Sequence, residues 1–240
     1  MKRIFHYLKK FNDASITFNI EEPDHSDYKI EENEWKYIYG NCTEEIPDKM
    51  PKSMGEKVII TTFVDANLLH DQTTGRSVTG VLHMLNKTPI ESFSKRQSQV
   101  ETATYGSEFM AMRIATEQII ELRYMLRMLG VPIEGPSWLF GDNMSVVISG
   151  TIPSSTLKKK WNALSYHHVR EAIAAGIINV FHISGEENPA DVLTKFLPHH
   201  RLYMLMKELI WWHEQKAKNS ENNTTKRMKK ITWKIPLVQL

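Results

Sequence analysis

Three strand-like runs followed by one long helical pattern constrain the fold of this chain more than any other feature. The runs span residues 58–64, 77–85 and 89–93. Only short turns separate them, which predicts an antiparallel meander. From residue 104 to 129 apolar residues recur at helical spacing, until Gly130 and Pro132 end the pattern. We expect this helix to pack on the meander through one apolar stripe, which begins with Glu108.

The second half of the chain alternates strand-like and helical segments. Strand-like runs cover residues 137–140 and 177–183, and helical patterns cover 143–149, 158–175, 191–196 and 200–212. The order β-β-β-α-β-α-α-β-α predicts a mixed α/β sheet with helices packed on it. A helix separates the strand at 137–140 from the meander, so we expect that strand to lie parallel beside the strand at 58–64.

The remaining segments indicate the domain organisation. Proline and glycine mark residues 46–55 as a linker, so we divide the chain into residues 1–55 and a domain at 56–213. Residues 35–39 have the apolar content of one or two strands. Residues 214–240 are polar and basic, and we expect them to be a disordered tail.

Composition and cysteine content limit the class of protein. The chain has 240 residues, a net charge of +2 and one cysteine, Cys42. A single cysteine excludes an internal disulfide and a cysteine-rich zinc site, and favours a reducing compartment. Residues 1–12 predict a short basic amphipathic helix rather than a signal peptide. No stretch reaches the roughly 20 apolar residues that span a bilayer. We therefore expect a cytoplasmic or nuclear protein without a membrane partner.

Four carboxylates in four separate local contexts form the candidate site. Asp65 and Asp142 follow strand-like runs, Glu108 opens the long helix, and Asp191 opens a short late helix. Each aspartate alone has a structural explanation as a turn residue, a helix cap or a helix-start charge. Burying an unpaired aspartate in mid-strand is costly, so we expect Asp65 at or near a strand end. Together, the four predict one cluster of acidic oxygens for hard divalent cations.

The strings around these carboxylates resemble the ribonuclease H domain at the C-terminal end of copia-type retrotransposon polyproteins. The similar strings are Val64-Asp65-Ala66, Gly75-Arg76-Ser77-Val78-Thr79-Gly80, Ser94-Lys95-Arg96-Gln97, Ser107-Glu108-Phe109-Met110-Ala111, Gly141-Asp142-Asn143-Met144-Ser145, Tyr166-His167-His168-Val169-Arg170-Glu171 and Asn188-Pro189-Ala190-Asp191-Val192-Leu193-Thr194-Lys195. The resemblance covers residues 57–198 and implies a ribonuclease H-like mixed sheet flanked by helices. Residues 1–10 resemble the end of the family's reverse transcriptase, so we expect residues 1–55 to be a reverse-transcriptase remnant.

The resemblance also implies an activity, its cofactors and the role of each carboxylate. The chain would hydrolyse RNA in RNA–DNA hybrids and leave 3′-hydroxyl and 5′-phosphate ends, with the reverse-transcriptase portion of the polyprotein as a partner. Asp65 would bridge two Mg²⁺ ions about 4 Å apart, for which Mn²⁺ is a possible substitute. Asp191 would hold the ion that activates water, and Glu108 with Asp142 the ion at the leaving oxygen.

Two segments supply candidate contacts to the hybrid. Asn143 and Ser145 follow Asp142 in the sequence. A basic cluster with one aromatic residue opens a predicted helix, and its members are Lys158, Lys159, Lys160 and Trp161. Such a cluster suits phosphate contact, although a solvated helix end explains it equally well. The adjacent histidines at 167–168 and 199–200 lack the spacing of a zinc site.

Two other functions remain open. Leu69 and His70 depart from the family's pattern near the first aspartate, which favours a decayed or domesticated fragment that folds without turnover. The loop at 184–187 also lacks the histidine that many cellular ribonucleases H carry there. An integrase or transposase would share the fold, but its last carboxylate is a glutamate, where this chain has Asp191.

Overall fold

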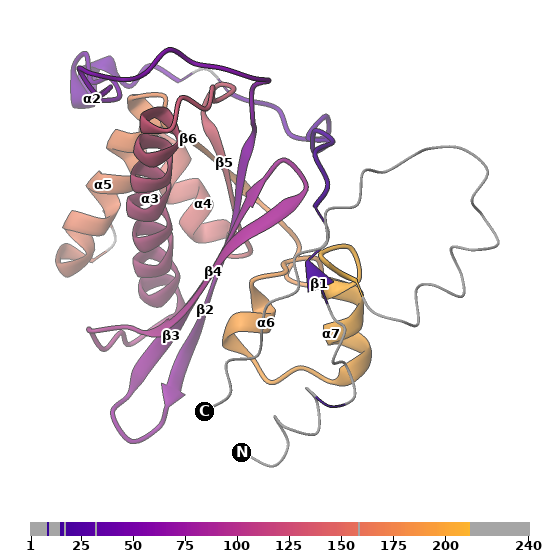
Figure 1. Cartoon of the computed structure of the whole chain (residues 1–240). Helices are drawn as coiled ribbons and strands as arrows, with labels where there is room; N and C mark the ends of the chain where they lie inside the picture. The colour runs from indigo at the N-terminus through magenta and orange to yellow at the C-terminus, as the bar shows by residue number, and fades with distance from the viewer. Residues whose placement is uncertain (1–8, 10–14, 17, 32, 158, 212–240) are drawn as a thin grey trace.

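The structure is a computed structural model that describes residues 9, 15–16, 18–31, 33–157 and 159–211 (Figure 1). The predicted helix at 1–12, apart from Lys9, and the predicted tail at 214–240 lie outside these described residues. Lys158 of the basic cluster lies outside them as well. Among the helices that are described, none combines the length and the apolar character needed to cross a membrane.

A five-stranded mixed sheet in the order β4-β3-β2-β5-β6 forms the centre of the molecule (Figure 1). The strands are β2 (Ile60–Asp71), β3 (Arg76–Leu85), β4 (Thr88–Arg96), β5 (Ser137–Gly141) and β6 (Ile178–His182). β2, β3 and β4 pair antiparallel. β5 lies parallel to β2, and β6 lies parallel to β5. The predicted meander with added parallel strands is confirmed.

Helices cover both sides of this sheet (Figure 1). The first layer contains α3 (Thr104–Met128), α4 (Met144–Thr151), the short 3-10 helix η1 (Lys160–Asn162) and α5 (Ala163–Ala174). The predicted stripe of α3 is buried from Glu108 to Leu126, while Arg113 and Glu117 pair on its outer side at 2.8 Å. On the other side lie α6 (Asp191–Thr194) and α7 (His199–Met206), where Leu193 and Met206 pack near Leu82.

Three segments differ from their predicted structure because distant residues decide their conformation. Residues 35–39 form no strand; they contain the short helix α2 (Lys36–Tyr39), which packs against α5. The helix predicted at 158–175 begins only with α5, after η1. The helix predicted at 200–212 ends with α7, and β7 (Ile210–Trp211) then pairs with β1 (Ser15–Ile16).

Residues 18–45 lie against the sheet and α5. The His25 ring lies 4.3 Å from the Trp138 ring, and the Tyr28 ring lies 4.9 Å from the Phe140 ring, measured between centroids. Trp35 is buried with the Arg170 guanidinium 4.8 Å from its ring centre. The boundary at 55/56 stays a prediction, and these contacts favour a single folding unit.

Glu44 connects the segment at residues 33–45 to α3 through ion pairs. Its carboxylate accepts hydrogen bonds from Arg123 at 2.7 and 2.8 Å and from Arg127. Burial alone would raise the pKa of Glu44, but the hydrogen bonds and charges of Arg123 and Arg127 outweigh it and lower the pKa to about 2. A carboxyl group whose pKa is depressed on folding stabilises the protein above its unfolded pKa, and this contribution is lost as the pH falls through the folded value.

Replacing Glu44 with Gln is expected to lower the free energy of unfolding at pH 7 by about 3 kcal/mol, because Arg123 is left buried without its charged partner. The difference from the wild type should shrink between pH 4.5 and 2, where the wild-type carboxylate becomes protonated. Urea unfolding of both proteins at the two ends of this pH range measures how far the difference in unfolding free energy shrinks. Glu45→Gln, an exposed neighbour, is the control. Equal stability of Glu44→Gln and the control at pH 7 would show that the ion pairs contribute nothing.

Candidate metal centre

Asp65 lies in the middle of β2, so the expectation that it ends a strand is wrong. It is opposite Gly80 of β3 and fully buried. The parallel pairing of β2 with β5 stops one residue earlier, at Val64 and Gly141. Burial in mid-strand is tolerated because the carboxylate is paired: Thr194 Oγ1 donates to Oδ2, and Lys195 Nζ donates to Oδ1 at 3.0 Å.

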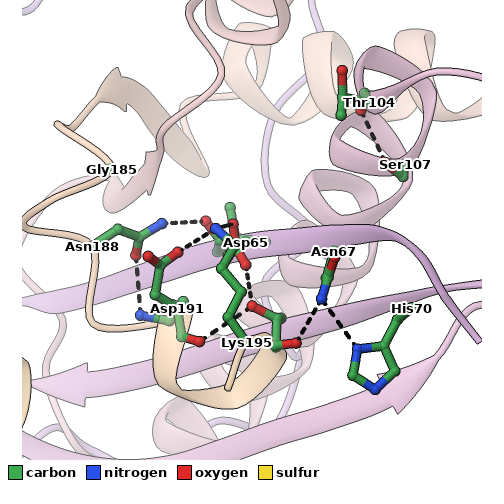
Figure 2. Close-up of polar contacts among 12 residues, drawn as sticks. Asp65, Asn67, His70, Thr104, Ser107, Gly185, Asn188, Asp191 and Lys195 are labelled. Carbon is green, nitrogen blue, oxygen red and sulfur yellow. Dashed lines mark hydrogen bonds and ion pairs between the residues drawn. The ribbon is translucent and has the colours of Figure 1, made fainter. Parts of the chain in front are cut away.

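Asp65, Asp142 and Asp191 come together at one end of the parallel strands. Each offers a carboxylate oxygen, and the three oxygens lie within 4.8 Å of one another. Asp142 directly follows β5, and Asp191 is the first residue of α6. Asn188 attaches the loop before α6 to β2 by donating to the Val64 carbonyl at 2.9 Å (Figure 2). Segments more than 40 residues apart in sequence thereby build one acidic cluster.

Glu108 borders this cluster from the side of α3. It is 9% exposed and lies on the buried side of α3. Burial, followed by the charges of Asp65 and Asp142, raises the pKa of Glu108 to about 9. Burial is also the first cause that raises the pKa values of Asp65 and Asp142. Glu108, the predicted fourth carboxylate, is thus close enough to Asp65 and Asp142 for their charges to raise its pKa. It is not one of the three residues whose carboxylate oxygens lie within 4.8 Å of one another.

The donor set fits a divalent cation. Raised pKa values at three neighbouring carboxylates mean that their negative charges are poorly compensated in the protein alone. Among the described residues, only Lys195 and Arg201 form ion pairs with the clustered aspartates. Carboxylate oxygens in such a cluster are the ligands that hard divalent ions prefer. The three aspartates can therefore hold a metal ion, and Glu108 can complete its surroundings.

Two glycines permit the close approach of the segments that carry the aspartates. A Cβ on Gly80 would lie 2.7 Å from Thr194 Cγ2 and 3.0 Å from the Ala190 carbonyl oxygen. Only a glycine at this place in β3 lets α6 pack directly on the sheet. A Cβ on Gly185 would lie 3.2 Å from Asp142 Oδ2. The loop after β6 therefore passes beside the second aspartate without displacing it.

The predicted hybrid contacts remain predictions. The Asn143 side chain accepts a hydrogen bond from the Val146 N–H at 3.3 Å and so caps α4, while Ser145 is exposed. Lys159 Nζ lies 3.4 Å from Thr102 Oγ1, just before the helix that bears Glu108. Lys160 is exposed. Trp161 is 68% exposed, and the Lys159 ammonium lies 5.7 Å from its ring centre.

Lys195 and Thr194 are site residues to which sequence reasoning assigned no role. Lys195 lies four residues after Asp191, the spacing at which opposite charges pair on a helix, so its contact with Asp191 was foreseeable. The contacts of both residues with Asp65 span about 130 positions of the sequence and had no local signal. His182 was also missed; its Nε2 donates to the Asp142 carbonyl at 3.1 Å.

Comparison with known proteins finds relatives among retrotransposon polyproteins. No protein-family model matches the chain. It is 29% identical over 159 residues to the Retrovirus-related Pol polyprotein from transposon TNT 1-94 of Nicotiana tabacum, which covers 66% of this chain and 12% of the polyprotein. It is 26% identical over 141 residues to that from transposon RE2 of Arabidopsis thaliana, which covers 59% of this chain and 10% of the polyprotein. The chain thus spans about a tenth of the length of these relatives.

Comparison with solved structures also finds similar chains. One is the compost-derived LC11-RNase H1 in complex with RNA/DNA hybrid, with a TM-score of 0.41 and 20% identity over 57% of this chain and 94% of the other. The strand order β4-β3-β2-β5-β6 with flanking helices agrees with the mixed sheet that the sequence predicted.

Proposed function

We propose that this chain, which is homologous to part of the copia-type retrotransposon Pol polyproteins, is a metal-dependent endonuclease that hydrolyses RNA in RNA–DNA hybrids. The observation that supports this most directly is the buried cluster of Asp65, Asp142 and Asp191, with oxygens within 4.8 Å of one another and Glu108 beside it. A cluster with so much uncompensated charge is costly for the fold alone, and a bound cation offsets that cost.

The four carboxylates would hold Mg²⁺, with two ions in the working site and Mn²⁺ as a substitute. When bound, such ions activate a water molecule and stabilise charge on the phosphate and the leaving oxygen. The protein positions the ligands: Thr194 orients Asp65, and Asn188 holds the loop before Asp191. These contacts hold Asp65 and the loop before Asp191 in the metal-free protein.

The substrate and partners follow from the same proposal. A hybrid would lie over the cluster with its RNA strand recognised through 2′-hydroxyl groups, for which Asn143 and Ser145 are the nearest candidates. The reverse-transcriptase portion of a longer polyprotein is the proposed partner. We place the activity in the cytoplasm, within a virus-like particle, or in the nucleus.

Cleavage of a labelled hybrid tests this function. The purified chain is incubated with Mg²⁺ and an RNA–DNA hybrid labelled on the RNA strand, beside single-stranded RNA, double-stranded RNA and an excess of chelator. We expect products with 3′-hydroxyl ends from the hybrid alone, and none in chelator. Equal cleavage of double-stranded RNA would indicate a different nuclease. Binding without cleavage would indicate the decayed fragment.

One observation bears on that decayed alternative. Leu69 lies in the left-handed region with φ 54°, within the irregular end of β2 between Asn67 and Asp71. A non-glycine residue is uncommon in this region of backbone conformation. Yet Asn67 Nδ2 still donates to the Thr194 carbonyl at 3.0 Å (Figure 2). The departure at Leu69 and His70 therefore leaves the contact between β2 and α6 intact, and the cleavage assay decides between the two functions.

Replacing Lys158, Lys159 and Lys160 with Ala is expected to weaken hybrid binding through lost phosphate contacts. Each contact contributes about 0.9 or less to the slope of log affinity against log salt, so the slope should flatten by about 2. Fluorescence anisotropy of a labelled hybrid at several salt concentrations measures both quantities.

A matched triple variant controls for net charge. Lys49, Lys52 and Lys57 are exposed, and replacing all three with Ala removes the same charge from the segment before β2. Its slope should equal that of the wild type. If the slope of log affinity against log salt is the same in both triple variants, the lysines at 158–160 make no specific phosphate contacts and are better explained as a solvated helix end.

A further inference from the structure

The Lys195 side chain lies inside the acidic cluster. Its Nζ is 2.6 Å from Asp191 Oδ1 and 3.0 Å from Asp65 Oδ1, so one ammonium joins two carboxylates that come from different elements (Figure 2). Both belong to the three aspartates whose oxygens lie within 4.8 Å. The ammonium thus contacts the same carboxylate groups that a metal ion would use.

The burial of the partners makes this contact important in the metal-free protein. The side chains of Asp65 and Asp191 are 0% and 6% exposed, so neither charge is well hydrated. Arg201 reaches only the second oxygen of Asp191, at 3.4 Å, and also donates to the Gly185 carbonyl at 2.6 Å. Among the described residues, Lys195 is therefore the one cation that pairs with Asp65.

The Lys195 ammonium can leave the cluster for the surrounding water. Its side chain is 35% exposed, whereas the two carboxylates are buried. A lysine has a flexible four-carbon stem, so its ammonium can move into water without moving the backbone. Asp65 cannot move in the same way, because its side chain is short and its backbone is paired with Gly80 in the sheet. When two cations compete for these oxygens, the lysine is the one that can leave.

We propose that Lys195 is an internal counter-ion that occupies the acidic cluster in the metal-free protein and is displaced when a divalent ion binds. This inference rests on the proposed function, since it takes the cluster to be a metal site. It assigns Lys195 two opposite effects. The ammonium stabilises the metal-free fold, because it compensates buried charge. It also weakens metal binding, because an incoming ion must first displace the ammonium from Asp65 and Asp191.

Mn²⁺ binding and thermal stability of the full chain test this role without any measurement of cleavage. Free Mn²⁺ is counted by electron paramagnetic resonance during titration of the wild type and of Lys195→Gln. The variant should bind Mn²⁺ at least about tenfold more tightly, since charge-assisted hydrogen bonds no longer compete. In chelator its unfolding temperature should fall below that of the wild type, and Mn²⁺ should restore it. Unchanged or weaker Mn²⁺ binding by the folded variant would overturn the proposal.

A matched control separates this effect from the loss of any lysine ion pair. Lys57 pairs with Glu134 at 2.7 Å on the surface, outside the cluster. Lys57→Gln should change neither Mn²⁺ affinity nor the response of the unfolding temperature to Mn²⁺. A gain in Mn²⁺ affinity as large as that of Lys195→Gln would reduce the effect to overall charge, and the proposal would fail.

The outcomes also separate this inference from the proposed function. If Lys195→Gln folds only when Mn²⁺ is present, the counter-ion role is supported. If it fails to fold even with Mn²⁺, the role is rejected, because removing a competitor cannot unfold the metal-loaded protein. If the wild type binds Mn²⁺ and cleaves hybrid while Lys195→Gln binds Mn²⁺ no better, only the counter-ion role fails. If neither protein binds Mn²⁺, the metal site and the proposed function fail together.

Discussion

Replacing Asp65 with Asn is expected to abolish hybrid cleavage while the fold stays intact. The side chain keeps its size and its place in β2, but the cluster loses one of the three carboxylates whose oxygens lie within 4.8 Å of one another. Metal-ion catalysis is worth several kcal/mol, so the rate should fall about a thousandfold or more. Single-turnover cleavage at saturating Mg²⁺ measures the rate, and circular dichroism checks the fold. Burial raises the pKa of Asp65, so removing this charge should not destabilise the metal-free protein.

The same substitution at the end of the same strand is the control. Asp71 lies outside the cluster and pairs with Arg96 at 2.5 Å. Asp71→Asn should retain wild-type cleavage, even if the hairpin between β2 and β3 loses some stability. The two-metal proposal would not survive if Asp65→Asn cleaved within tenfold of the wild-type rate. Nor would it survive if the wild type worked equally well in excess chelator.

The meander and α3 could be predicted because their signals are local. Apolar runs and the short turns between them are enough to place β2, β3 and β4, and a period of 3.6 is enough to define a helix on which Glu108 lies on the buried side. The order of elements then limited the ways in which β5 could join the sheet. The acidic cluster could be predicted because Asp142 follows β5, Asp191 opens α6 and Glu108 lies in the first turns of α3.

The end of β2 could not be predicted, because backbone pairing continues where the apolar pattern stops. Asp65, Asn67 and His70 interrupt the run, yet β3 pairs with the strand as far as Asp71. The partners that make a buried Asp65 acceptable come from α6 and the residue after it, about 130 positions later. A sequence window around the strand does not contain them.

The conformation of residues 35–39 also depends on residues that are distant in the sequence. Their apolar and aromatic content predicts a strand, but the structure has the helix α2. Trp35 lies over Arg170, and the Tyr39 hydroxyl accepts a hydrogen bond from Arg170 Nε at 3.3 Å. A side chain in α5 therefore determines where these aromatic rings lie, and propensity alone gives no information about it.

A chain that begins at Glu56 is expected to lose most of its stability. The sequence alone gave the opposite expectation, because the strands and helices after residue 56 already close a sheet. In the structure, His25 and Tyr28 cover the aromatic face formed by Trp138 and Phe140. Removing them exposes rings whose burial is worth about 1.5–3 kcal/mol each, and removing Glu44 adds about 3 kcal/mol more. Such a loss is comparable to the whole stability of a typical domain.

Urea unfolding of three chains tests this expectation: the full chain, a chain that begins at Ser15 and a chain that begins at Glu56. The chain from Ser15 keeps the described contacts of residues 18–45 and should unfold at the same urea concentration as the full chain. The chain from Glu56 should unfold at much lower urea, or be unfolded in buffer, and bind a hydrophobic dye through its exposed aromatic face. If instead it unfolds with the full chain and retains its nuclease activity, residues 18–45 are peripheral and the boundary at 55/56 is correct. The contacts of Glu44 and Trp35 would then be those of a segment that folds onto a finished domain.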